Sequence, residues 1–520
     1  MSSDTFVALS PLITLGVAAL AILALLCVRR SHALTMLLCL AGLVTALVLQ
    51  VITYHAQAVA VRFNPASPAL LYLSGYSAYF IGLILAAAIA VTLLSYDYLR
   101  RTFAADGVEE YYILLLLATL GSCVLAASAH FVSFFLGLEI LSVSLYVLIA
   151  YRPGEAIGIE GGIKYLVLAA VSSAFLLFGM ALVYARWGTM DLGQLAAHIT
   201  TAAPNAGLVT LAGLAMILVG IGFKLAVVPM HLWTPDVYQA APAPVTAFIA
   251  TISKGAMFAL LLRYFTQVGY AYYAGLVVLF MVLAVVTMFV GNILALVQNN
   301  VKRLLAYSSI AHVGYLLVAF LASREALSHE GMSLCMQAVG FYLLAYFVMT
   351  LGAFGVVGAL STRHGDAQRV EDFRGLFYRR PVLAVVLSIM LMSLAGLPLT
   401  AGFVGKFLIV RAGVGTGLWV LTILLVLNSA LSVYYYLRVV AVMFSRHDDA
   451  EVYGEGVPPL RLAVASPAQT RINLAAGLTL AVLLISVIIL GTYPNAALDL
   501  IQQLLASPSA LAHEAALVGR

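Results

Sequence analysis

Charged side chains are scarce in this 520-residue sequence. Asp, Glu, Lys and Arg make up only 9% of the residues, whereas 64% are hydrophobic. Soluble globular domains carry about 25% charged residues, so the composition excludes an ordinary water-soluble enzyme. The net charge of +5 comes from arginines between apolar runs and does not indicate nucleic-acid binding.

Motifs for metals and nucleotides are also missing. The four cysteines stand singly in apolar runs, without a CxxC pair: Cys27, Cys39, Cys123 and Cys335. An iron–sulfur cluster, a structural zinc or a disulfide framework is therefore not indicated. No GxGxxG fingerprint occurs, and residues 402–406 (GFVGK) lack the spacing and the preceding strand of a phosphate loop. We expect no cofactor and no metal to bind this chain.

Long apolar runs take up most of the length. They predict an all-α polytopic membrane protein with about fourteen transmembrane helices of roughly 20 residues or more. A first run at 6–28, followed by two arginines, predicts a span and no cleavable signal peptide. The predicted spans are 6–28, 33–53, 74–99, 111–128, 130–151, 160–186, 207–241, 243–266, 272–295, 301–322, 333–361, 381–411, 418–444 and 473–493.

Two of these runs contain helix breakers. Pro229 and Pro235 interrupt the run 207–241, and Gly396 and Pro398 interrupt the run 381–411. Proline removes a backbone donor and clashes with the preceding turn. Irregular backbone at membrane depth is tolerated where it is buried in protein or lines a wet cavity. We therefore predict two discontinuous helices.

A weak internal repeat relates the two halves of the chain. Each half has a lysine close to its broken helix, Lys224 and Lys406. Transporters are often built from two inverted repeats with sites at discontinuous helices, and spans 4–8 and 9–13 would form two inverted five-helix repeats. The predicted organisation is an N-terminal three-helix segment (1–110), a first repeat (111–266), a second repeat (267–445), and a cytoplasmic loop with the last span (446–520).

Loop charges predict the orientation of the spans. One set of alternate loops is rich in Lys and Arg, including Arg29, Arg30, Arg379 and Arg380, and the other set is poor in them. Positive loops remain in the cytoplasm. Both termini are then extracytoplasmic, and the loop 445–472 is cytoplasmic.

Five ionisable residues lie within or at the rim of apolar runs: Glu139, Lys164, Lys224, Lys254 and Lys406. A charge at the bilayer centre costs about 2.5–3.5 kcal/mol on insertion scales, and such residues commonly mark proton or ion pathways. A structural ion pair or a protonated, hydrogen-bonded acid is the alternative for Glu139. Lys164 is nearer a helix end and could instead extend its ammonium to the interface.

Two histidines are secondary candidates. His231 and His312 lie in or beside apolar runs and could pass protons, because imidazole titrates near neutrality. A hydrogen-bonded packing role fits each of them equally well. Neither has metal-ligand spacing with a carboxylate or a cysteine.

The segment 223–242 (FKLAVVPMHLWTPDVYQAAP) resembles the signature of the antiporter-like membrane subunits of respiratory complex I. Its His-x-Trp-x-Pro-Asp core is shared with cation/proton antiporter subunits and membrane hydrogenases. The WTPDVY form is similar to that of subunit N. Lys406 stands where subunit M has a glutamate, and the short tail lacks the long lateral helix of subunit L. The match runs from the Glu139 span to the Lys406 span.

The resemblance implies roles for single residues. Glu139 and Lys224 match the ion-pair carboxylate and lysine of the first half-channel, and Lys164 matches the adjacent lysine. Lys254 matches the central connecting lysine, and Lys406 the lysine of the second half-channel. Fourteen helices, two inverted repeats and two discontinuous helices are implied as well.

The implied function is proton translocation by a non-redox subunit of a bacterial NADH:quinone oxidoreductase. NADH, FMN, iron–sulfur clusters and quinone would be bound by partner subunits. The implied partners are subunit M as neighbour, the small subunits K and J, and the lipid of the inner (plasma) membrane. A subunit of a multisubunit cation/proton antiporter and a structural membrane scaffold remain as alternatives.

Overall fold

A computed structural model describes residues 3–53, 59–62, 67–103, 107–152, 154–202, 207–325, 329–363, 365–445 and 473–505. Most of the expected loop 445–472 and the last residues of the chain lie outside this described part. The predictions for that loop and for the C-terminus therefore stay untested.

Helices form nearly all of the structure. The helices are α1 (Ser3–Val28), α2 (His32–Thr53), α3 (Gly75–Thr102), α4 (Glu110–Ala127), α5 (Phe131–Ile149), α6 (Ala156–Trp187), α7 (Leu192–Ala202), α8 (Gly207–Leu225), α9 (Trp233–Ala240), α10 (Ala243–Phe248), α11 (Lys254–Gln267), α12 (Ala274–Leu296), α13 (Val301–Leu321), α14 (His329–Leu360), α15 (Leu376–Arg379), α16 (Pro381–Ala395), α17 (Ala401–Gly415), α18 (Trp419–Phe444), α19 (Leu474–Thr492) and α20 (Asn495–Leu505). Two short strands, β1 (Val59–Val61) and β2 (Leu71–Leu73), pair antiparallel.

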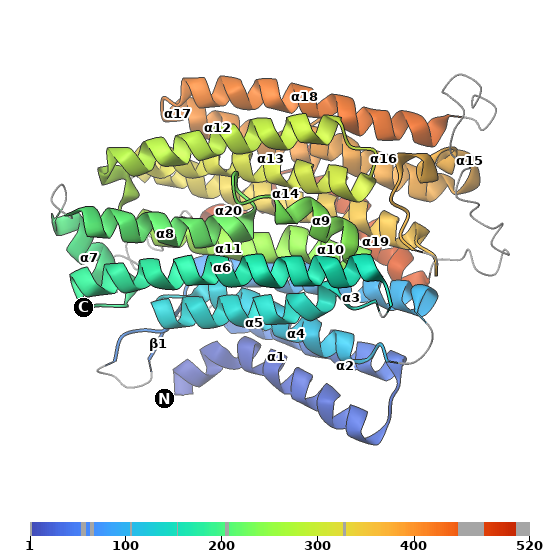
Figure 1. The fold of residues 1–520 in the computed structure, drawn as a ribbon, viewed down its shortest axis with the longest axis horizontal. Coiled ribbons are helices and arrows are strands. Elements are labelled where there is room, and N and C mark those ends of the chain that lie inside the picture. Colours follow the sequence, from blue (N-terminus) through green and yellow to red (C-terminus); the bar gives the residue numbers. More distant parts are fainter. Residues whose placement is uncertain are drawn as a thin grey trace.

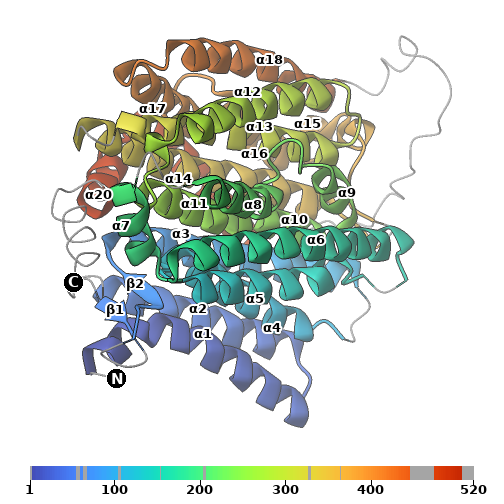
Figure 2. The same cartoon turned by 60° about the vertical axis from the view of Figure 1, so that its left-hand side comes forward.

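The long helices run side by side along one direction (Figure 1). Helices α1 and α2 form one edge of the bundle, and α17 and α18 form the opposite edge (Figures 1 and 2). The helices α11, α13 and α14 are almost completely buried, whereas α1, α6 and α18 expose many large apolar side chains. The most protected positions for polar groups are therefore in the central helices.

The predicted spans agree closely with the structure. Among the described residues, thirteen helices are long and apolar enough to cross a membrane. The remaining predicted span, 381–411, is divided between α16 and α17, which have 15 residues each. The all-α polytopic fold is thus confirmed, while the inverted relation between the two halves stays a prediction.

The first discontinuity falls at Pro229, whereas Pro235 lies in the first turn of α9. Helix α8 ends at Leu225, ahead of Pro229, and α9 begins at Trp233. Ending a helix leaves backbone carbonyls without intrahelical partners. The indole Nε1 of Trp233 donates to one of them, the Phe223 carbonyl, at 2.9 Å. A side chain from the same motif therefore supplies a hydrogen-bond donor to the end of α8.

The second discontinuity depends on Gly396. Helix α16 ends at Ala395, and Gly396 adopts φ = +88°, a conformation that costs other residues steric strain. A Cβ at this position would also lie 2.8 Å from Cδ of Lys406. Glycine is thus needed both for the turn and for the approach of the lysine.

Three short elements were not predicted. The β1–β2 pair, α7 and α20 lie at the end of the bundle where α1 begins (Figure 2). A π-helical turn, Ile249–Ser253, joins α10 to α11 and ends directly before Lys254. Such turns are rare and frequently occur at functional sites.

Candidate functional site

Lys224 lies in the last turn of α8, at the first discontinuity. Its side chain is buried, and Nζ donates to Tyr165 Oη at 2.7 Å and to Ser142 Oγ at 2.9 Å. The ammonium also faces the ring of Tyr165, 5.2 Å from its centroid. Helices α5 and α6 thus supply the polar groups that hold this lysine.

Glu139 lies one turn before Ser142 on α5. Its Oε1 accepts a hydrogen bond from Ser173 Oγ at 2.7 Å. Within the described residues, Glu139 and Lys224 do not approach to ion-pair distance, 4.0 Å. The structure therefore shows Glu139 on α5 and Lys224 on α8 separated, each with a hydroxyl partner.

Lys164 is placed at the rim and not among the buried lysines. Its side chain is 44% exposed and pairs with Glu160 at 2.6 Å and with Asp236 at 3.1 Å. Asp236 also pairs with Arg303 at 2.7 Å. The position agrees with the interfacial alternative for Lys164, although Tyr165, the next residue, contacts Lys224.

Lys254 begins α11 after the π-helical turn. Its buried Nζ donates to Ser309 Oγ on α13 at 2.7 Å and faces the Tyr238 ring at 5.7 Å. Ser309 also accepts from Tyr346 Oη at 2.8 Å. Hydroxyl groups from α9, α13 and α14 therefore surround the central lysine.

His312 lies one turn after Ser309 on α13 and is buried. Its Nδ1 is 2.6 Å from Tyr342 Oη, and its Nε2 is 3.3 Å from Tyr436 Oη. The ring also contacts the ring of Tyr346, with 5.2 Å between the centroids. The imidazole thus continues the polar group around Lys254 towards α14 and α18.

Lys406 fills the second discontinuity. Its buried Nζ donates to the Ala395 carbonyl at 2.7 Å and to Ser429 Oγ at 2.8 Å. The ammonium faces the ring of Tyr315 at 5.4 Å. The Ala395 carbonyl is available because α16 ends there, so the break itself supplies a ligand for the lysine.

A pair of buried asparagines adjoins Lys406 through Tyr315. Asn292 Nδ2 donates to Tyr315 Oη at 2.9 Å and to Asn428 Oδ1 at 3.2 Å. Tyr435 Oη donates to Asn292 Oδ1 at 3.0 Å. These groups connect α12, α13 and α18 across the second half.

His231 is apart from these groups. It lies in the connection between α8 and α9 and is buried. Its Nδ1 has no hydrogen-bond partner among the described residues. The structure thus joins His312 to the buried lysines but gives no such connection for His231.

Sequence reasoning missed the hydroxyl and amide groups that surround the buried lysines and His312. They are Ser142, Tyr165, Asn292, Ser309, Tyr315, Tyr342, Tyr346, Ser429 and Tyr436. The available signal was a polar residue inside an apolar span, which usually needs a partner. Such residues are common in this chain, so the choice between them needs the packing.

The arrangement can hold and pass protons through amines, hydroxyls and imidazole. No cluster of His, Cys, Asp or Glu suited to a metal ion is found in the described ranges. Each buried lysine has hydrogen-bond acceptors, and the tyrosine and serine hydroxyls can both donate and accept. These are the properties of a proton path.

The chain is similar to known proteins over most of its length. Residues 128–432 match the family described as NADH:quinone oxidoreductase/Mrp antiporter, TM. The chain is 42% identical over 512 residues to NADH-quinone oxidoreductase subunit N of Ectopseudomonas mendocina (strain ymp), covering 96% of both chains. It is 45% identical over 447 residues to the protein of the same name from Methylococcus capsulatus (strain Bath), covering 85% of this chain and 87% of the relative.

Solved structures of two membrane complexes contain chains with a similar fold. A chain of respiratory complex I from Thermus thermophilus with bound aureothin is 33% identical, with a TM-score of 0.74, covering 94% of this chain and 98% of that one. A chain of the Mrp complex from Dietzia sp. DQ12-45-1b has a TM-score of 0.82 at 22% identity, covering 99% and 100%, and shares the fold. The chain therefore belongs to the NADH:quinone oxidoreductase/Mrp antiporter transmembrane family, in the group of its subunits N.

Proposed function

We propose that protons cross the membrane through this subunit of an NADH-quinone oxidoreductase by way of Glu139, Lys224, Lys254, His312 and Lys406. Glu139 and Lys224 form the proton-loading pair of the first half, and Lys254 connects the two halves. His312 and its tyrosines carry protons towards Lys406. Lys164 and His231 are peripheral members, because the first is at the rim and the second has no partner joining it to the path.

The observation that carries this proposal is the surroundings of the three buried lysines. Within the described residues, Lys224, Lys254 and Lys406 have hydroxyl and carbonyl partners but no carboxylate at ion-pair distance. Lys302, by contrast, is buried against Asp366. A lysine kept only for structure would need such a counter-charge to be tolerated. Three lysines without one support a role in which the charge changes.

The role proposed for this subunit within the enzyme is to move protons while other subunits carry out the redox chemistry. The subunit performs no redox step itself, and it binds neither NADH, FMN, an iron–sulfur cluster nor quinone, which are handled by partner subunits. It adjoins other membrane subunits, with subunit M as the neighbouring antiporter-like subunit and K and J as the small ones. It lies in the bacterial inner membrane with both termini outside.

The test uses Glu139→Gln and Lys254→Ala in the intact complex. Both variants should assemble and keep normal electron transfer from NADH to an artificial acceptor. Quinone reduction and proton pumping should fall together, by about 10-fold or more, because a general acid or base contributes about 100–10,000-fold. Each activity is measured per assembled complex in membrane vesicles.

The scaffold alternative predicts another pattern. A chain that only orders its neighbours would lose quinone reduction in proportion to lost assembly, with unchanged activity in each assembled complex. Full proton pumping by well-assembled Glu139→Gln and Lys254→Ala variants would rule out the relay.

A further inference from the structure

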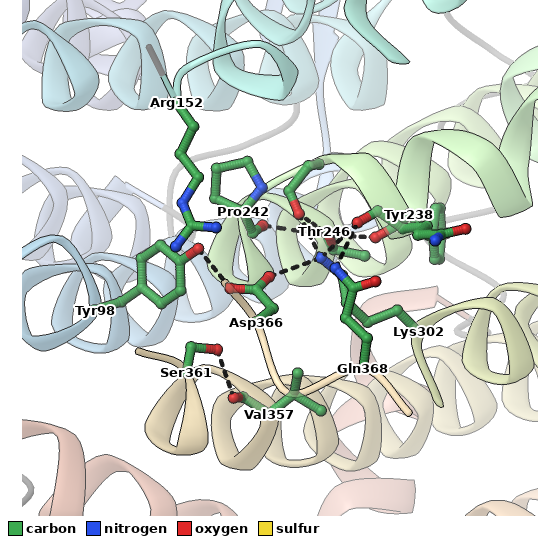
Figure 3. A network of polar contacts seen from close by, with 12 residues as sticks. Tyr98, Arg152, Tyr238, Pro242, Thr246, Lys302, Val357, Ser361, Asp366 and Gln368 are labelled. Carbon is green, nitrogen blue, oxygen red and sulfur yellow. Dashed lines mark hydrogen bonds and ion pairs between the residues drawn. The ribbon is translucent and has the colours of Figure 1, made fainter. Parts of the chain in front are cut away.

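A second group of buried charges lies outside the proton path (Figure 3). Lys302 Nζ donates to Asp366 Oδ2 at 2.8 Å, and the two side chains are 0% and 2% exposed. Tyr98 Oη donates to the other carboxylate oxygen at 2.7 Å. From the sequence alone, Lys302 is only one of the loop cations. In the structure it is among the most buried charges of the chain.

Lys302 also holds the C-terminal end of α9. Its Nζ donates to the Ala241 carbonyl at 2.6 Å and to the Gln239 carbonyl at 3.1 Å. The last carbonyls of a helix lack intrahelical donors, and a cation there is favourable. Gln368 Nε2 donates to the same Gln239 carbonyl at 3.3 Å.

Thr246 secures this turn from the other side. Its Oγ1 lies 3.2 Å from the Tyr238 carbonyl and 3.3 Å from the Ala241 carbonyl, and it can donate to either. The connection between α9 and α10 is thus fixed by a lysine from α13 and a threonine from α10. Figure 3 shows both side chains pointing to it.

Tyr238 lies near the end of α9 that Lys302 and Thr246 hold, and its ring faces Lys254. Its ring lies 5.7 Å from Lys254 Nζ, and its hydroxyl is 3.4 Å from Ser309 Oγ, the acceptor of Lys254. A shift of the end of α9 would therefore change the surroundings of Lys254 directly.

We propose that Lys302 and Asp366 form a clamp that positions Tyr238 against Lys254. The proposal rests on the proton path above. Asp366 belongs to the connection between α14 and α16, and Tyr98 ties it to α3, so the clamp joins parts of both halves at one end of the bundle. Lys302 and Asp366 are positioning residues, and they carry no proton themselves.

The test replaces both charges by apolar side chains, Lys302→Met with Asp366→Leu. Removing one partner alone would leave a buried unpaired charge, whereas apolar replacement of a whole buried pair is often tolerated. The double variant should assemble and reduce artificial acceptors normally. Its proton pumping per complex should fall about 10-fold, since a misplacement of about 1 Å at a reacting group can cost about 100-fold.

A second readout follows the position of α9 itself. Hydrogen–deuterium exchange of peptides covering 236–246 should be faster in the double variant than in the unmodified complex.

Two single variants complete the test. Lys302→Arg keeps a donor for both the carbonyls and Asp366, and it should restore most of the pumping. Thr246→Val removes the other hydrogen-bonding group at the end of α9 and leaves the ion pair intact, so it should cause smaller losses of pumping and smaller increases in exchange. If the double variant fails to assemble, Thr246→Val tests whether the position of α9 affects pumping.

Asp97 and Arg101 provide a matched control. They form a 3.0 Å ion pair at the same end of the bundle, and Arg101 donates to the Gly358 and Ala359 carbonyls at the end of α14. Arg101→Met with Asp97→Leu should leave both pumping and exchange of 236–246 unchanged. A similar loss in this control would overturn the specific role of the clamp.

The outcomes separate the clamp from the path. Normal pumping in the assembled double variant, or unchanged exchange of 236–246, overturns the clamp. Full pumping in Lys254→Ala would instead refute the proton path, and faster exchange in the double variant would still support the hold of Lys302 on α9.

Discussion

At the scale of the residue, the partners of each lysine decide its role. Lys302 has a carboxylate and is a structural cation, whereas Lys224 and Lys406 are held by neutral oxygens. Neutral partners tolerate both forms of the amine, because a hydroxyl can accept from the charged form and donate to the uncharged form. The sequence identifies the lysines, but it cannot show which of them has a counter-charge.

Tyr165 gives a prediction at this scale. Tyr165→Phe keeps the ring beside Lys224 but removes the hydroxyl that accepts from it. A hydrogen bond to a charged group is worth about 1.5–3 kcal/mol, so pumping should fall by about 10-fold or more with normal assembly. Tyr184→Phe, at an exposed position of the same helix, is the control and should pump normally. Equal activities of the two variants would argue against a role for Tyr165.

At the scale of the element, the two broken helices could be predicted from the sequence. The contacts that the lysines make at the breaks could not. Prolines and glycines within apolar runs indicate the breaks. That Lys406 itself binds the freed Ala395 carbonyl depends on how α17 packs against α16. The π-helical turn before Lys254 likewise has no local signal, since residues 249–253 (IATIS) contain neither proline nor glycine.

The second break predicts a large effect of Gly396→Ala. A positive φ costs a non-glycine residue about 1–2 kcal/mol, and the new Cβ would press on Lys406. The free energy of unfolding should fall by about 1–3 kcal/mol, measured as thermal stability of the purified complex. Gly477→Ala is the matched control, because a Cβ there meets nothing within 4 Å. Equal stability of the two variants would contradict the proposed strain.

The connection between α14 and α16 predicts an acid sensitivity. Burial by itself would raise the pKa of Asp366, but the charges of Lys302 and Arg152 and hydrogen bonds from Lys302 and Tyr98 hold that pKa below its ordinary value. The unfolded carboxyl titrates near about 3.9. The folded state therefore binds fewer protons, so this stabilisation is present above about pH 4 and is lost as the pH falls through the folded pKa.

Asp366→Asn should show the difference. Thermal unfolding of the unmodified complex should lose stability on acidification below about pH 4, and the variant should lose less there. At neutral pH the variant should be less stable by about 3–5 kcal/mol, because Lys302 is left without its counter-charge. An identical pH dependence in both proteins would show that Asp366 is not the group responsible.

At the scale of the whole molecule, the sequence predicted the number and order of the spans well. Hydrophobicity alone separates membrane helices from connections, because lipid satisfies no backbone groups. The β1–β2 pair, α7 and α20 escaped prediction because they are short and lie at the end of the bundle. In the sequence, the relation between the two halves is suggested only by Lys224 and Lys406. The polar groups around these two lysines come from several other helices, so they could not be predicted from the neighbouring sequence.

The orientation of the bundle is predicted from the arginines. Arg152 and Arg363 belong to one end of the bundle, since Arg152 donates to the Thr362 carbonyl. Met190 lies beyond the other end of α6. In a Cys27→Ser background, Arg363→Cys should react with an impermeant reagent only in inside-out vesicles, and Met190→Cys only in spheroplasts. The reverse pattern would invert the topology.

The account depends most on the claim that the buried lysines carry protons, and Lys406 tests it most directly. Proton pumping and quinone reduction per assembled complex are measured in proteoliposomes containing Lys406→Ala complex, with Arg411→Ala as the control that removes an exposed charge from the same helix. The account predicts normal electron transfer to artificial acceptors in both, with pumping and quinone reduction lost only in Lys406→Ala. Full pumping by a well-assembled Lys406→Ala complex would contradict it.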